Sequence, residues 1–119
     1  MSIKTAGLLL QKTPYLGHQT ILKVFAPEHG MLTFFAQKIS FTPFALIECV
    51  YRPQEKEMQK LMDCSLIDPL WNLRQSYDSV LAAGSIAHDL LRTQMPNKKA
   101  NELFDLTVFY LKKLPIAAE

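Results

Sequence analysis

The chain has few of the residues on which most phosphate-binding and hydrolytic sites depend. Its 119 residues include only four glycines. A loop that cradles phosphate needs several glycines close together, because backbone N–H groups must approach the anion. No such run is present, and neither is a GxSxG or HExxH motif. These absences disfavour an enzyme and leave binding as the class of function to consider.

Cysteine is also scarce. Cys49 and Cys64 stand without CxxC spacing and without a paired histidine nearby. With no signal peptide at the N-terminus, two scattered thiols are typical of a reduced, cytoplasmic protein. We therefore expect both to pack as small hydrophobic residues, and we expect no metal and no cofactor.

Charge of either sign is nearly balanced. Lys and Arg number 13 against 11 Asp and Glu, which gives a net charge of +2. Neither half of the chain can attract nucleic acid by bulk charge, so a basic surface would have to arise by local clustering. The apolar run 39-ISFTPFALI-47 is too short and too rich in turn residues to span a bilayer.

Hydrophobic residues make up 49% of the chain, enough to build a core. Five short apolar or alternating segments predict strands, at residues 3–12, 19–26, 31–38, 44–52 and 58–67. Consecutive short strands of this kind fit a small five-stranded Greek-key barrel of the OB type. Because residues 19–26 carry apolar groups on both faces, we expect the barrel to be partly covered on its outside.

The turn Pro27-Glu28-His29-Gly30 raises the question of a catalytic loop. His29 beside Glu28 could act as an acid/base pair, but neighbouring turn residues usually point apart into water. We therefore predict a structural turn with Gly30 at positive φ. His18 and His88 have no second ligand at helical spacing, so a zinc site has no support.

After Asp68-Pro69 the pattern becomes helical. Residues 77–94 predict a helix with Ser76 as its N-cap, which ends at residues 95–97. Residues 98–114 predict a second helix. The expected fold class is thus β + α, with an OB-fold barrel over residues 1–69 followed by a partial α-helical domain over residues 70–119, made of two main helices.

The second helix is apolar almost all round, and such a helix must be buried on several sides. Two helices and a barrel hardly provide enough cover, so we expect a partner chain or a further segment to pack against it. The predicted partner-binding residues are Leu103, Phe104, Val108 and Leu111.

An OB barrel offers a specific way to bind nucleic acid. Single strands lie across the second and third strands, with phosphates on basic side chains and bases stacked on aromatic rings. The candidates here are Lys12, Tyr15, Lys23, Phe35, Lys38 and Arg52. Two alternatives remain open: Phe35 suits a core position equally well, and lysines at strand ends often serve only to protect a sheet edge.

Four stretches of the chain together resemble one protein family. They are 3-IKTAGLLLQKTPY-15, 20-TILKVFAPEHGML-32, 43-PFALIECVY-51 and, more weakly, 103-LFDLTVFYLKKL-114. In this order they are similar to the bacterial RecO family of recombination mediators and DNA-repair proteins. The resemblance covers nearly the whole chain and is strongest over residues 3–51.

The resemblance implies an N-terminal OB domain joined to an α-helical domain, without a catalytic centre. It also implies binding of single- and double-stranded DNA and annealing of complementary strands. The partners it implies are RecR and the C-terminal tail of the single-stranded-DNA-binding protein, with which the family loads recombinase onto coated DNA.

The chain departs from the family pattern in two ways. Where family members usually carry a loop rich in Lys, Arg and Gly, residues 37–42 contain the single Lys38. Family chains are also considerably longer, and many carry a C-terminal cysteine cluster that can hold zinc. We interpret the chain as a truncated or fragmentary member. The alternative hypothesis is an OB-fold protein-interaction module or oligomerising scaffold that self-associates through the last helix and binds DNA weakly or not at all.

Overall fold

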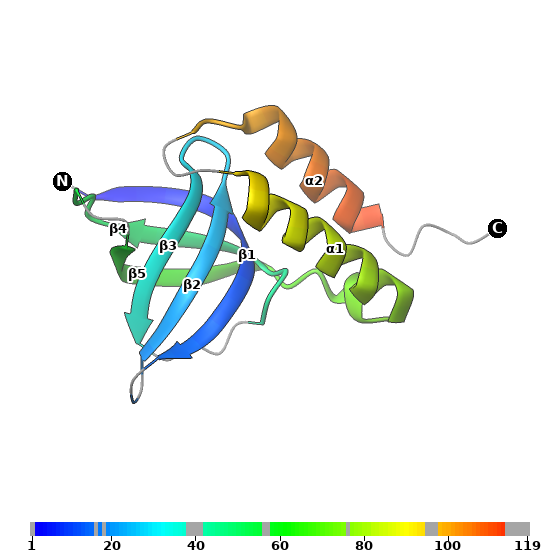
Figure 1. Ribbon diagram of the computed structural model, residues 1–119, viewed down its shortest axis with the longest axis horizontal. Helices are drawn as coiled ribbons and strands as arrows, with labels where there is room; N and C mark the ends of the chain where they lie inside the picture. Colours follow the sequence, from blue (N-terminus) through cyan, green and yellow to red (C-terminus); the bar gives the residue numbers. More distant parts are fainter. Residues whose placement is uncertain are drawn as a thin grey trace.

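The computed structural model describes residues 2–15, 17, 19–37, 42–55, 58–75, 77–94 and 98–113 (Figure 1). Its elements are β1 (Ile3–Tyr15), β2 (Gln19–Ala26), β3 (Gly30–Gln37), β4 (Leu46–Tyr51), β5 (Met58–Asp68), the 3-10 helix η1 (Trp71–Gln75), α1 (Tyr77–Thr93) and α2 (Asn101–Lys113). The predicted roles of His18, Lys38, Ser76, Leu114 and residues 95–97 lie outside the described residues.

The five strands close into a barrel in the order β1-β2-β3-β5-β4, and β4 pairs back with β1. All neighbouring strands are antiparallel except β3 and β5, which are parallel. Two helices follow the barrel, as the sequence predicts. A five-stranded barrel with this Greek-key order is the OB fold, so the predicted fold class is confirmed.

Two hydrophobic cores are built from the two faces of the same strands. One fills the barrel and contains Leu9, Leu22, Val24, Ala26, Leu32, Phe34, Ala36, Ala45, Ile47, Cys49 and Tyr51. The other lies between the barrel and the helices and contains Leu8, Leu10, Phe25, Met31, Leu70, Leu73, Ala83, Ala87, Leu90, Phe104 and Leu111. Val24 and Phe25 therefore belong to different cores, as the apolar residues on both faces of β2 predict.

The two helices lie side by side near the β2–β3 turn (Figure 1). Besides the core that both helices share with the barrel, three contacts connect α2 and the residue before it to the rest of the described chain. The Phe25 and Phe104 rings lie 5.7 Å apart between centroids. The Ala100 N–H donates to the Pro27 carbonyl over 2.8 Å. The Asn72 side chain donates to the Leu111 carbonyl over 2.7 Å, which joins η1 to the C-terminal end of α2.

Several predicted boundaries are wrong, and each has a physical reason. The second helix begins at Asn101 rather than residue 98, because Ala100 donates its N–H to the β2–β3 turn. β1 continues through Pro14 to Tyr15, where it pairs with β2 alone, an edge position of the kind that tolerates proline. β4 begins at Leu46 because Phe44 has a φ of 72°, which is incompatible with a strand. The short helix η1 has no counterpart in the prediction.

The turn between β2 and β3 is structural, and Gly30 adopts the expected positive φ of 72°. The His29 ring meets Tyr51 at 84°, with 6.3 Å between centroids, so it covers one end of the barrel core. Among the described helices, none is long and apolar enough to cross a membrane.

Candidate nucleic-acid interface

The outer face of β2 and β3 near the β1–β2 turn is the first place to look for a binding surface. Figure 1 shows α1 and α2 near the opposite end of these strands, at the β2–β3 turn. Leu22 and Phe34 point into the barrel, so their neighbours Lys23 and Phe35 point outward. Tyr15 belongs to the same face, because it lies opposite Gln19 at the start of β2.

An aromatic pair occupies this face. The Tyr15 and Phe35 rings lie 5.6 Å apart between centroids at an angle of 76°, an edge-to-face contact that spans β2. Tyr15 is exposed and Phe35 is half-buried. Exposed aromatic surface on a sheet can stack with nucleic-acid bases of any sequence, since every base has a π face.

Lys23 lies flat on the sheet next to this pair. Its ammonium donates a hydrogen bond of 2.8 Å to the Thr33 hydroxyl, directly across the β2–β3 ladder. A lysine ammonium carries three protons, so two remain for another acceptor. The bond to Thr33 orients the lysine and leaves it able to contact a phosphate.

Lys60 completes the face and is the residue that the sequence reasoning missed. It lies opposite Phe35 in the parallel β3–β5 ladder and is exposed. Met58 and Lys60 are two residues apart in the predicted strand, so the sequence indicates that their side chains share a face. The sequence could not show which strand they lie beside, because the β3–β5 pairing joins distant segments.

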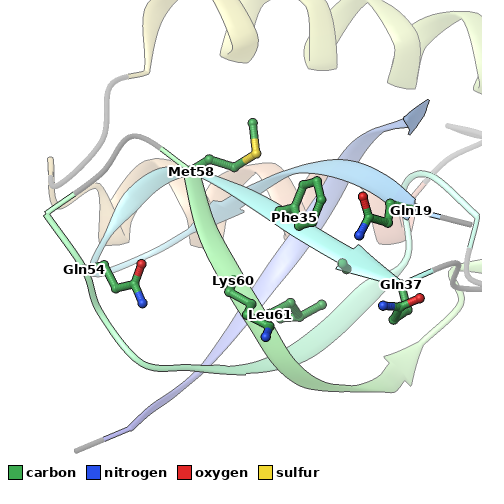
Figure 2. Close-up of a pocket in the computed structure, with 8 residues that line it drawn as sticks. Gln19, Phe35, Gln37, Gln54, Met58, Lys60 and Leu61 are labelled. Atoms are coloured by element: carbon green, nitrogen blue, oxygen red, sulfur yellow. The ribbon is translucent and has the colours of Figure 1, made fainter. Parts of the chain in front are cut away.

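A groove opens where β3 and β5 separate. Among the described residues of these two strands, pairing extends from Thr33 to Phe35 of β3, and beyond Phe35 the edges diverge. The resulting hollow has a volume of about 470 Å³, and Figure 2 shows Phe35, Lys60, Leu61 and three glutamine side chains around it. Its lining is Gln19, Phe35, Ala36, Gln37, Gln54, Met58, Lys60 and Leu61. Amide groups beside an aromatic ring and a cation can serve both base edges and phosphates.

A second, smaller hollow continues the groove along β5. It has a volume of about 220 Å³ and shares Ala36, Gln37 and Leu61 with the first. Its other lining residues are Met62, Asp63 and Cys64. The cationic part of the groove is therefore the end near Lys60.

The remaining predicted DNA contacts do not all join this face. Lys12 is half-buried and lies opposite Leu22, an inward-facing residue. Arg52 is exposed just after β4, and Gln54, which follows in the same loop, lines the groove. Reciprocal hydrogen bonds of 2.8 and 2.9 Å between Gln54 and Gln59 hold that loop. The structure thus brings Tyr15, Lys23 and Phe35 together, and it places Arg52 two residues before Gln54, which lines the groove.

Comparison with known proteins points to one kind of relative. No family model matches the chain. DNA repair protein RecO of Chlamydia trachomatis serovar D is 26% identical over 124 residues, which cover 97% of this chain and 51% of that protein. RecO of Chlamydia muridarum is 25% identical, with coverage of 97% and 53%. RecO of Thermodesulfovibrio yellowstonii is 27% identical over 126 residues, with coverage of 95% and 50%.

The chain is RecO-like. It spans about half the length of the curated relatives it matches. Among the described residues of this RecO-like chain, no group of three or more histidine, cysteine, aspartate or glutamate side chains could hold a metal ion.

The four residues predicted to bind a partner do not form one surface. Phe104 and Leu111 are buried against the barrel, and Val108 packs beside them. Leu103 is exposed to solvent on about a third of its surface, at 36%. The most exposed apolar side chains of α2 are Leu106 and Phe109, at 64% and 60%, and the Lys113 ammonium lies 5.2 Å from the centre of the Phe109 ring. Partner binding by the predicted four remains a prediction.

Proposed function

We propose that the chain takes part in DNA repair by binding single-stranded DNA, without catalysis, on the outer face of β2 and β3. The main support for this proposal is the Tyr15–Phe35 pair, which lies beside Lys23 and Lys60 on an open face of an OB barrel. The similarity to RecO proteins, which are named as DNA repair proteins, supports the repair role.

In the proposed complex, bases stack on Tyr15 and Phe35 while phosphates contact Lys23, Lys60 and Arg52. Lys12 and Lys38 remain proposed contacts from the sequence. Each lysine–phosphate contact with a single strand releases counterions, which steepens the dependence of log affinity on log salt by about 0.7. Binding of this kind is tolerant of sequence, because stacking and phosphate contact do not read base edges.

The wider role rests on the resemblance to RecO. We propose binding of double-stranded as well as single-stranded DNA, annealing of complementary strands, and recombinase loading with RecR and the C-terminal tail of the single-stranded-DNA-binding protein. These steps would take place in the cytoplasm and need no cofactor bound to this chain.

A fluorescence anisotropy titration of labelled oligo-dT at low salt tests the proposal. We expect saturable binding that weakens steeply as salt is added. Non-specific protein–DNA dissociation constants lie at about 1–100 µM, so no binding at ~50 µM protein would remove direct DNA contact from the function.

The second candidate function is a protein-interaction module that uses the barrel as a scaffold. The exposed Leu106 and Phe109 on α2 favour it, because exposed apolar side chains gathered on one helix are typical of an interaction surface. Sedimentation at several protein concentrations tests self-association. A folded chain that stays monomeric at every concentration would contradict an oligomerising scaffold.

A further inference from the structure

The two cysteines, distant in sequence, are cross-strand neighbours in the barrel. Cys49 on β4 lies directly opposite Cys64 on β5 in the antiparallel ladder. Cys49 belongs to the core inside the barrel and is 0% exposed, and Cys64 packs against the same core. Both are free thiols. The ladder thus places one thiol beside the other on the inward face of the sheet.

Only one of the two thiols can be reached from outside. Cys64 is half-buried and lines the smaller hollow of the groove, together with Leu61, Met62 and Asp63. Cys49 lies behind it with no accessible surface. A small reagent that enters the groove therefore meets Cys64 first.

The thiols also differ in acidity for a reason that the geometry explains. A hydrogen bond with Cys49 lowers the pKa of Cys64. The same hydrogen bond, followed by burial, raises the pKa of Cys49. Cys64 is thus the thiol that ionises first, and Cys49 holds its proton and donates it to the Cys64 sulfur. An accessible thiol of lowered pKa beside a second cysteine is the arrangement found in redox-active pairs.

We propose that Cys49 and Cys64 form an oxidisable dithiol, a modification site at the end of the β3–β5 groove that reacts with small-molecule disulfides to give an internal disulfide between β4 and β5. Cys64 is the attacking residue and Cys49 the resolving one.

The reaction proceeds in two thiol–disulfide exchanges. The Cys64 thiolate attacks one sulfur of the small disulfide, which breaks the S–S bond and releases one thiolate. The Cys49 sulfur then attacks the Cys64 sulfur, and its proton leaves with the second small thiolate. Two protein thiols are oxidised, one small disulfide is reduced to two thiols, and the two protons from the cysteines end on those thiols.

The first step prepares the second. In the mixed disulfide the Cys64 sulfur carries no charge and no longer accepts the Cys49 proton as a thiolate would. The largest cause of the raised pKa of Cys49 is therefore removed. Directly opposed residues in an antiparallel pair have Cβ atoms about 4.5–5.5 Å apart, and a disulfide needs about 3.5–4.5 Å. A small approach of β4 and β5 is enough to close the bond.

Treatment of the full chain with oxidised glutathione tests the proposal, with iodoacetamide to block remaining thiols and intact-mass spectrometry as the readout. We expect the wild-type chain to lose both alkylatable thiols and the mass of two hydrogen atoms, to carry no glutathione, and to regain both thiols with dithiothreitol. A chain that retains glutathione on Cys64, or that forms disulfide-linked dimers in place of the internal bond, would overturn the proposal. So would a folded chain left unreacted under conditions in which the urea-unfolded chain reacts.

Two variants assign the roles. Cys49→Ala should stop at the mixed disulfide and keep one glutathione on Cys64. Cys64→Ala should gain none while folded, because Cys49 is inaccessible. Equal rates of glutathione uptake by the two variants would contradict the assigned order. If circular dichroism shows that either variant is unfolded, the wild-type mass result alone decides between an internal disulfide and none.

Discussion

The rings of Tyr15 and Phe35 meet edge to face across β2, with centroids 5.6 Å apart. The contact exists because β1 continues past Pro14, which places Tyr15 opposite Gln19 at the open end of the face. The two rings hold each other in place before any ligand arrives. A preformed surface loses less side-chain freedom on binding than one that must be ordered by its ligand.

Removal of the Phe35 ring should weaken DNA binding. Base–aromatic stacking contributes about 1–3 kcal/mol per base, so Phe35→Ala should reduce the affinity for oligo-dT by about 5- to 150-fold. The measurement is the anisotropy titration at fixed salt. Phe109→Ala is the matched control, because Phe109 is an exposed aromatic residue on α2. It should bind as the wild type does, and equal affinities of all three chains would exclude stacking on Phe35.

Lys60 should contribute through charge alone. Lys60→Gln removes one proposed phosphate contact, so the slope of log affinity against log salt should become shallower by about 0.7. Titrations at several salt concentrations give the slope. Lys99→Gln removes the same charge from an exposed site between α1 and α2 and should leave the slope unchanged. If the salt dependence of Lys60→Gln has the same slope as that of the wild type, the DNA does not contact Lys60.

Local sequence pattern predicts most of the fold of this chain. The apolar residues on both faces of β2 predict a barrel with a covered outside, and Val24 and Phe25 do face the two cores. The pattern fails where a long-range contact decides the local structure. Phe44 delays the start of the predicted fourth strand, because its N–H donates to the Leu9 carbonyl of β1 over 2.6 Å while its φ is 72°.

In the candidate site, too, local sequence pattern predicts some residues, and long-range pairing decides the others. Residue type and the OB-fold hypothesis make Tyr15, Lys23 and Phe35 candidates, although Tyr15 lies beyond the predicted first strand and Phe35 suits the core equally well. Lys60 is not among them, since its place beside Phe35 depends on the parallel pairing of β3 with β5. The pattern of α2 likewise shows that the helix is apolar, but not which of its faces meets the barrel. Phe104 faces the barrel and Phe109 faces solvent.

This difference between the two phenylalanines gives a stability test. Phe104 is 7% exposed and packs on Phe25, so Phe104→Ala should lower the free energy of unfolding by about 3–5 kcal/mol. Phe109→Ala should change it by no more than about 0.5 kcal/mol, because the side chain is exposed. Urea unfolding measures both values. Similar losses for the two variants would contradict the docking of α2 on the barrel.

The buried phenol of Tyr51 should make the barrel sensitive to alkali. The ring packs against Phe34, with 5.1 Å between centroids, and burial raises the pKa of Tyr51 above its ordinary value of 10.0, with a smaller contribution from Cys49. The unfolded chain, whose phenol titrates near the ordinary pKa, then releases its proton more readily than the folded chain. The contribution to stability is therefore complete below pH 10 and is lost as the pH rises above it.

Tyr51→Phe isolates this effect, because it keeps the packed ring and removes the ionisable hydroxyl. Its free energy of unfolding, measured with urea on both sides of pH 10, should fall less steeply with rising pH than that of the wild type. Tyr77→Phe makes the same chemical change at a side chain that is 77% exposed, and it should retain the wild-type pH dependence. If Tyr51→Phe and Tyr77→Phe lose stability with the same slope above pH 10, burial of the Tyr51 phenol does not govern the alkaline unfolding of the barrel.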